Sequence, residues 1–129
     1  MPPAASGWQA AVPVFKVRMA GMNAPELGRN GDPDQCWALK AKNWLRQSAQ
    51  LRPGTTVHFE LAQDTDQDQY HRLIRWIYTG DRNIDLAALA AGNGEHSTFR
   101  VPGEPHYIEM LAAEAYAQAN HLGMWGACS

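Results

Sequence analysis

Three charged residues in two short stretches could together hydrolyse a phosphodiester bond. Arg18 and Glu26 lie in VRMAGMNAPE (residues 17–26), and Arg72 lies in DQYHRL (residues 68–73). Such hydrolysis needs a carboxylate that takes a proton from water near neutral pH, and cations that stabilise the charge building up on the phosphate. One glutamate and two arginines supply both. Their spacing also fits a second interpretation, in which the arginines are solvated strand residues and Glu26 belongs to a turn.

A divalent cation commonly shares this work, and the chain carries acidic residues that could hold one. Asp64, Asp66 and Asp68 precede Arg72 in the acidic stretch QDTDQDQ (residues 63–69). Hard cations prefer oxygen ligands and need several of them. The residues alone therefore leave a metal site open without assigning it.

The chain as a whole lacks the charge of a strong nucleic-acid binder. It has 129 residues, with 11 Lys+Arg against 13 Asp+Glu and a formal net charge of −2. Strong nucleic-acid binders usually present a basic face, so DNA or RNA would need a bound cation or a local cluster of arginines here. No apolar run approaches the roughly 18–20 residues that span a bilayer, and no membrane partner is expected.

The length predicts one compact domain. We expect residues 1–7, which are small and Pro-rich, to form a disordered tail, and residues 8–129 to form a single domain. A leader removed before residue 1 would make this an exported protein, periplasmic or extracellular. Without such a leader the protein would be cytoplasmic.

The hydrophobic patterns predict strands followed by helices. Alternating residues indicate strands over about 14–20, 55–61 and 70–78, with the second of these placing Val57, Phe59 and Leu61 on one face. Helices are predicted from Pro33, with Asp32 as its N-cap, to about residue 49, from an Asn83 cap to about 90, and over about 105–121. In the last helix the inward residues would be Ile108, Leu111, Ala112, Ala115 and Ala119. This order favours an α+β domain on a small antiparallel barrel.

Five stretches in this order resemble the staphylococcal nuclease-like (thermonuclease) family. They are VRMAGMNAPE, LRPGTTVHFELA, DQYHRLIRWIY, NIDLAALAAG and AEAYAQANHLGMWG, and the likeness covers roughly residues 14–128. The resemblance implies an OB-fold-type antiparallel β-barrel with three helices. It also implies calcium-dependent hydrolysis of DNA and RNA.

The resemblance gives roles to individual residues. Arg18 and Arg72 match the two catalytic arginines, and Glu26 matches the glutamate taken as general base for the attacking water. Tyr70 looks like the tyrosine that lines the nucleotide pocket. Asp68 matches an acidic residue that helps to shape the site and is a weak candidate metal ligand.

Several departures from the family fall on the metal and substrate sites. Asn23 stands where the family has a calcium-ligating acid, and it offers one carbonyl oxygen without charge. The family's Asp-Gly-Asp-Thr turn would fall near Ala4 and is absent, so we expect a truncated first strand and a weak or absent calcium site. An open barrel edge would favour a homodimer through edge pairing or strand exchange.

Two further departures concern the substrate. His71 replaces a usual glycine, and it is either a solvated residue or a phosphate or metal contact. Thr98 and Arg100 replace nucleotide-stacking tyrosines, and Arg100 could meet a phosphate instead.

The two cysteines, Cys36 and Cys128, leave their state open when taken alone. They resemble a pair seen in exported members of the family, which implies a disulfide between them.

Two functions are weighed from the sequence: a metal-dependent nuclease, and a non-catalytic OB-fold module that binds nucleic acid or protein.

Overall fold

The computed structural model describes residues 16–62 and 66–128. The strands of this part are β1 (Val17–Met19), β2 (Met22–Asn23), β3 (His58–Leu61), β4 (Leu73–Thr79), β5 (Arg82–Asn83) and β6 (Glu95–His96). The helices are α1 (Ala38–Gln47), α2 (Ile84–Ala90), α3 (Tyr107–Ala119) and the one-turn α4 (Met124–Ala127). The expected tail over residues 1–7 and the residue near Ala4 lie outside the described residues.

Strand β4 is the centre of the larger sheet. β1 pairs with one of its edges and β3 with the other, while β5 continues from its end by a tight turn. β2 and β6 form a separate antiparallel pair. The fold is α+β, as predicted, and within it the β1–β4 pair is parallel where the other pairs are antiparallel. That pairing sets Arg18 opposite Ile74, two residues beyond Arg72.

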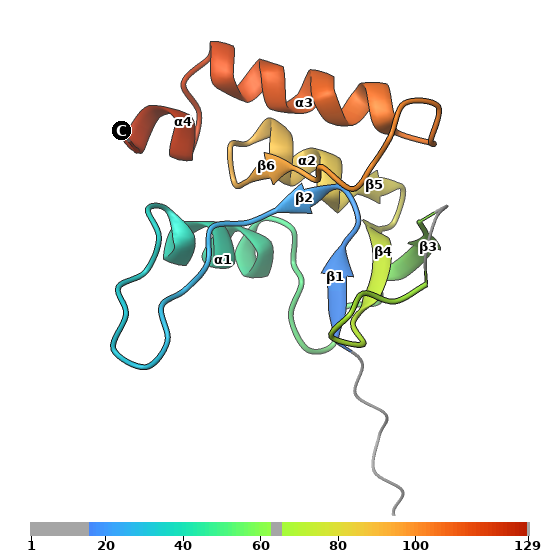
Figure 1. The fold of residues 1–129 in the computed structure, drawn as a ribbon, viewed down its shortest axis with the longest axis horizontal. Helices are drawn as coiled ribbons and strands as arrows, with labels where there is room; N and C mark the ends of the chain where they lie inside the picture. The colour runs from blue at the N-terminus through green and yellow to red at the C-terminus, as the bar shows by residue number, and fades with distance from the viewer. Residues whose placement is uncertain (1–15, 63–65, 129) are drawn as a thin grey trace, which may run out of the picture.

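Helices cover the sheet and build the core around it. α3 lies over α2 at one end of the molecule, and α1 lies on the other side of β2 (Figure 1). The larger cluster of buried side chains includes Met22, Trp76, Leu89 and Met110. Asn83 caps α2 as predicted, because its side-chain oxygen accepts a hydrogen bond from the Leu86 N–H at 3.1 Å.

Two predictions about helices are wrong. α1 begins at Ala38 and not at Pro33, because Trp37 at its N-cap has a left-handed backbone with φ of 74°. In α3 the predicted inward residues Ile108, Ala112, Ala115 and Ala119 are exposed, Ile108 by 79%. The buried residues are instead Met110, Glu114 and Ala117.

Glu114 explains how α3 is rotated about its axis. Its carboxylate accepts a hydrogen bond from the His96 backbone N–H and contacts His96 Nδ1, both at 2.8 Å. A pattern that counts only apolar residues places such a glutamate outside. Here the polar contacts turn it inward.

Strand β3 is a sheet edge among the described strands. Phe59 and Leu61, on one of its faces, are 47% and 57% exposed. The homodimer through an open edge stays a prediction, and light scattering on the purified protein tests it. Within the described part of the chain, no helix has the length and apolar character needed to cross a membrane.

Candidate active site

Arg18 is held at the end of β1 by oxygen atoms of the corner that follows it. Its Nη1 donates to the carbonyl oxygens of Met19 at 3.0 Å and Met22 at 3.4 Å, and its Nη2 donates to Asn23 Oδ1. Burial, and then the nearby charge of Arg72, lower the pKa of Arg18 below its usual value. Two like charges are therefore fixed close together, which favours an anion between them.

Arg72 is fixed by a tight turn rather than by a strand. Its Nε lies 2.7 Å from Asp68 Oδ2, while Asp68 Oδ1 accepts the backbone N–H groups of Tyr70 at 2.8 Å and Arg72 at 3.0 Å. Burial would raise the pKa of Asp68, but these hydrogen bonds outweigh it and lower the pKa below its usual value. Because the turn occupies residues 68–72, β4 begins at Leu73 and not at Tyr70 as predicted.

His71 has the backbone that the turn requires. Its φ is 63°, in the left-handed region that glycine adopts at least cost, which accounts for the glycine expected at this position. Its side chain is exposed and lines neither hollow of the site described next.

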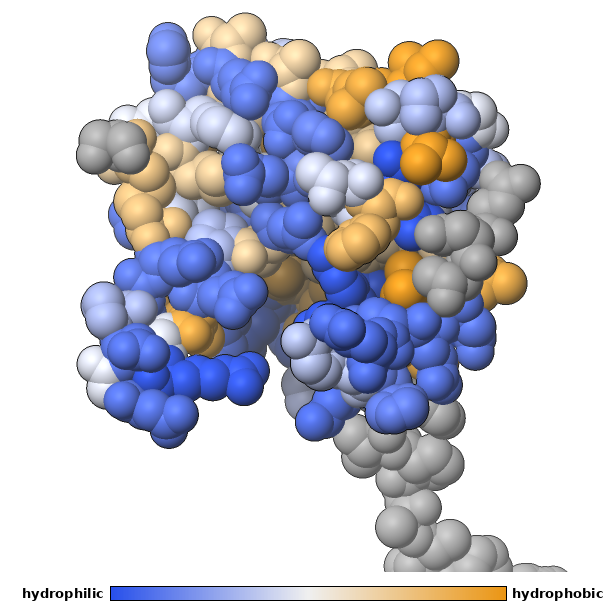
Figure 2. Space-filling model, viewed as in Figure 1, coloured by the Kyte–Doolittle hydropathy of each residue, from blue (hydrophilic) through white to orange (hydrophobic). Residues whose placement is uncertain are grey.

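Two adjoining hollows share Arg18, Met19 and Arg72 as a common wall. The larger, a groove of about 600 Å³, runs between β1 and the loop after β2, where Figure 2 shows the surface hollowed between hydrophilic residues. It is lined by Asn23, Glu26, Arg29 and Lys42 among others. The smaller, a cavity of about 360 Å³, is lined by Asp68, Tyr70, Phe99 and Arg100 among others.

Glu26 reaches the groove from the loop after β2. Its side chain is exposed, and its backbone is held by Gln35 through two hydrogen bonds of 2.8 and 2.9 Å. The three residues proposed for chemistry from the sequence, Arg18, Glu26 and Arg72, thus line one groove.

Comparison with known proteins identifies the family of the chain. The model of the family described as "Staphylococcal nuclease homologue" matches residues 16–127. The chain belongs to this family. Membership accounts for the α+β fold.

Curated relatives of this nuclease family come from fungi. A probable endonuclease LCL3 of Colletotrichum graminicola is 29% identical over 134 residues, which covers 92% of this chain and 46% of the relative. The protein of the same name in Phaeosphaeria nodorum is 25% identical over 115 residues, covering 84% of this chain and 37% of the relative. This chain therefore spans less than half the length of these relatives.

The substrate residues predicted from the sequence fall in the smaller cavity, except His71. Tyr70 is 67% exposed, and the Arg72 guanidinium lies over its ring, 5.5 Å from the centroid. Arg100 is only 4% exposed, and its Nη1 lies 3.3 Å from Glu104 Oε1. Sequence reasoning missed Phe99, which is 67% exposed beside them, although it sits between the two positions compared with the family's tyrosines.

The described residues do not fit the calcium site that the family resemblance implies. Asn23 Oδ1 accepts a hydrogen bond from Arg18, and both oxygens of Asp68 are used by Arg72 and Tyr70. Over residues 16–62 and 66–128, no group of three or more His, Cys, Asp or Glu side chains is placed to hold a metal ion. Asp64 lies outside this part of the chain.

A buried carboxylate that the sequence analysis did not single out supports the corner. Asp85, at the start of α2, has no exposed surface, and it accepts the Gly21 N–H at 2.9 Å and the Ile77 N–H at 3.0 Å. Burial raises its pKa to about 6, although these hydrogen bonds act in the opposite direction. Asp85 thereby joins β4 to the turn between Arg18 and Asn23.

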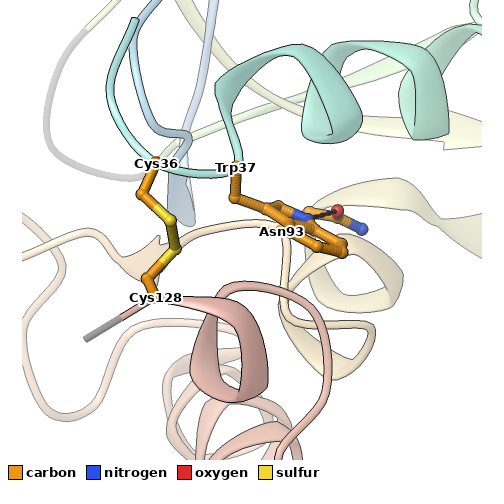
Figure 3. Close-up of a disulfide and its surroundings, with 4 residues drawn as sticks. All are labelled: Cys36, Trp37, Asn93 and Cys128. Atoms are coloured by element: carbon orange, nitrogen blue, oxygen red, sulfur yellow. Dashed lines mark hydrogen bonds between the residues drawn. A yellow bond between two sulfur atoms is a disulfide. The ribbon is translucent and has the colours of Figure 1, made fainter.

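Cys36 and Cys128 form a disulfide, the pairing that the family resemblance implies. It ties the segment just before α1 to the residue after α4 (Figure 3), and the two Cα atoms lie 6.0 Å apart. Next to it, the Trp37 indole N–H donates to Asn93 Oδ1 at 2.9 Å.

Proposed function

We propose that this chain is a phosphodiesterase that cuts DNA or RNA within the strand. One observation carries the proposal: the groove collects four basic side chains and one carboxylate in a chain of net charge −2. The basic residues are Arg18, Arg29, Lys42 and Arg72, and the carboxylate is Glu26. This is the local basic cluster that an acidic chain needs in order to bind a polyanion.

The reaction follows from the positions of these groups. A phosphate diester enters between Arg18 and Arg72, whose guanidinium groups donate to its non-bridging oxygens. Glu26 takes a proton from a water molecule while the oxygen of that water bonds to phosphorus. The opposite P–O bond breaks, and the arginines stabilise the charge that builds up on the phosphoryl oxygens. The leaving oxygen then takes a proton from solvent.

Calcium is expected from the resemblance and is assigned no step here. The oxygens of Asn23 and Asp68 are engaged within the protein, so a bound ion would need ligands from the substrate, from water or from residues beyond the described ones. The activity assay described below therefore also tests whether cutting requires calcium, because it compares calcium with other cations and with EDTA.

The second candidate is a module that binds nucleic acid without cutting it. The same engagement of Asn23 and Asp68 favours this alternative. Its groove would hold the phosphate backbone between the arginines, with Glu26 outside any chemistry. Both candidates have DNA or RNA as partner.

Degradation of plasmid and single-stranded DNA separates the two. We would incubate the wild type with calcium, magnesium, manganese or EDTA, beside Glu26→Ala purified identically. Glu109→Ala is the matched control, because Glu109 is 66% exposed on α3 and lines neither hollow. Cutting by the wild type and by Glu109→Ala, lost in Glu26→Ala, supports the nuclease.

Binding by all three proteins without cutting under any cation would make the binding module the function. Cutting that survives EDTA would show that the reaction needs no divalent ion. Cutting that survives in Glu26→Ala would overturn the role of this residue or point to a contaminating nuclease, which Arg18→Ala purified alongside would reveal.

A further inference from the structure

The loop after β2 is closed at its base by Gln35. The Glu26 N–H donates to Gln35 Oε1 at 2.8 Å, and the Gln35 N–H donates to the Glu26 carbonyl oxygen at 2.9 Å. Inside this ring the Gly28 N–H donates to Asp34 Oδ1 at 2.8 Å. A Cβ on Gly28 would come within 1.9 Å of the Asp32 carbonyl oxygen, so the two sides of the loop are in close contact.

Gln35 is in turn attached to the body of the protein by its neighbours. Cys36 is bonded to Cys128, which is 92 residues away in sequence. Trp37 is hydrogen-bonded to Asn93, and the two attachments lie side by side (Figure 3). The backbone of Glu26 is therefore connected through one hydrogen-bonded residue to a covalent link.

Neither Gln35 nor Cys36 lines the groove, whereas Glu26 does. Arg29, on the same loop, also lines it, so an effect of either residue on the reaction would pass through the positions of Glu26 and Arg29. Arg18 differs, because its guanidinium is bonded to oxygens of the β1–β2 corner and not to the loop. Loosening the loop where Gln35 closes it would thus displace Glu26 while Arg18 and Arg72, the two arginines proposed to contact the reacting phosphate, stay in place.

We propose that Gln35 is a positioning residue for Glu26, and that the Cys36–Cys128 disulfide holds Gln35 in position. This inference rests on the proposed function for its effect on cutting. It makes the oxidised protein the active form. A dithiol that reduces the S–S bond to two thiols, and is itself oxidised to a disulfide, lowers the rate of cutting more than it weakens substrate binding.

Gln35→Ala removes the side-chain acceptor, and Gln35→Glu keeps an oxygen in its place. The control is Gln118→Ala, an exposed glutamine of α3 that lines neither hollow. On a short single-stranded DNA, Gln35→Ala is expected to lose about 10- to 100-fold in kcat with a much smaller change in KM, because a small displacement of a reacting group is costly. Gln35→Glu restores kcat and, by adding charge near Glu26, moves the acidic limb of the pH profile upward.

The disulfide is tested in the same assay. Wild type treated with a dithiol and the Cys36→Ser/Cys128→Ser variant should both lose kcat by a similar factor, with a much smaller change in KM. The double variant should no longer respond to the dithiol. Circular dichroism at the assay temperature establishes that each protein is folded.

Amide hydrogen exchange at Glu26 provides a readout that needs no activity. Exchange at this N–H should accelerate in Gln35→Ala and in the reduced wild type, but not in Gln118→Ala. Unchanged exchange in folded, reduced protein would overturn the role of the disulfide, and unchanged exchange in Gln35→Ala would overturn that of Gln35. If no protein cuts while exchange responds as expected, the loop attachment holds and it is the proposed function that fails.

Discussion

Arg18 and Glu26 line the same groove, but the structure holds them in different ways. Arg18 is half-buried on a strand, its guanidinium donates to three oxygens, and Asp85 fixes the turn beside it. Glu26 has an exposed side chain on a loop, and only its backbone is held by Gln35. The two arginines proposed to bind phosphate are therefore held by β1, its corner and the turn before β4, while the proposed proton acceptor depends on a loop.

The largest expected effect lies on the loop side. Glu26→Gln keeps the size and the backbone contacts of Glu26 but cannot accept a proton. We expect kcat to fall by about 10²- to 10⁴-fold, the usual contribution of a general base, while binding of single-stranded DNA persists. Steady-state kinetics and fluorescence anisotropy measure the two quantities. A variant that loses binding and cutting together would show that Glu26 acts on the substrate complex and not on the water.

Removing one of the two arginines of the groove should have a different effect from changing Glu26. Arg72→Ala removes one of the two cations and leaves Asp68 without its partner, so both binding and kcat should fall, the latter by about 10²- to 10³-fold. Arg75→Ala is the control, because Arg75 pairs with Asp66 at 2.6 Å and lines neither hollow. Equal losses in the two variants would mean that the effect is on the fold alone.

Asp85, the buried carboxylate that supports the turn after Arg18, predicts that the stability of the protein depends on pH. The pKa of Asp85 is about 6 in the fold, above the value of about 3.9 for an unfolded aspartate. Between these pH values the folded protein keeps a proton that the unfolded chain releases. The free energy of unfolding therefore falls as pH rises through this window, by about 3 kcal/mol in total.

Asp85→Asn cannot ionise and should lack this part of the pH dependence. Urea unfolding at pH 4 and pH 7 measures the difference for the wild type and the variant. Asp81→Asn, in the exposed turn before β5, is the control. If the stability of the wild type and that of Asp85→Asn change equally with pH, the pKa of Asp85 is not raised.

The smallest expected effect concerns the metal. Asn23→Asp places a carboxylate beside Arg18, at the position where the family resemblance implies a calcium ligand. The added charge is expected to strengthen calcium binding by roughly 10- to 100-fold, equivalent to about 1–3 kcal/mol. Isothermal titration calorimetry with calcium measures it, with Asn43→Asp on the exposed surface of α1 as the control. If calcium binding is unchanged, Arg18 neutralises the new carboxylate and the corner is no longer a metal site.

The sequence by itself was enough for the family, the fold class and the three residues of the proposed chemistry. Arg18, Glu26 and Arg72 could be proposed because their motifs are short and local, and because five such motifs stand in one order. The cap of α2 was predictable for the same reason, since Asn83 acts on an N–H only three residues away.

The tertiary structure decided what depends on contacts between distant residues. Glu114 faces the interior of the protein and contacts His96, so α3 buries a different set of residues from the one that its apolar pattern predicts. Asp85 reaches Gly21, 64 positions earlier in the chain, and Gln35 reaches Glu26 across a closed loop. Polar contacts of this kind leave no periodic signal, because each is a single pairing whose energy appears only after the chain has folded.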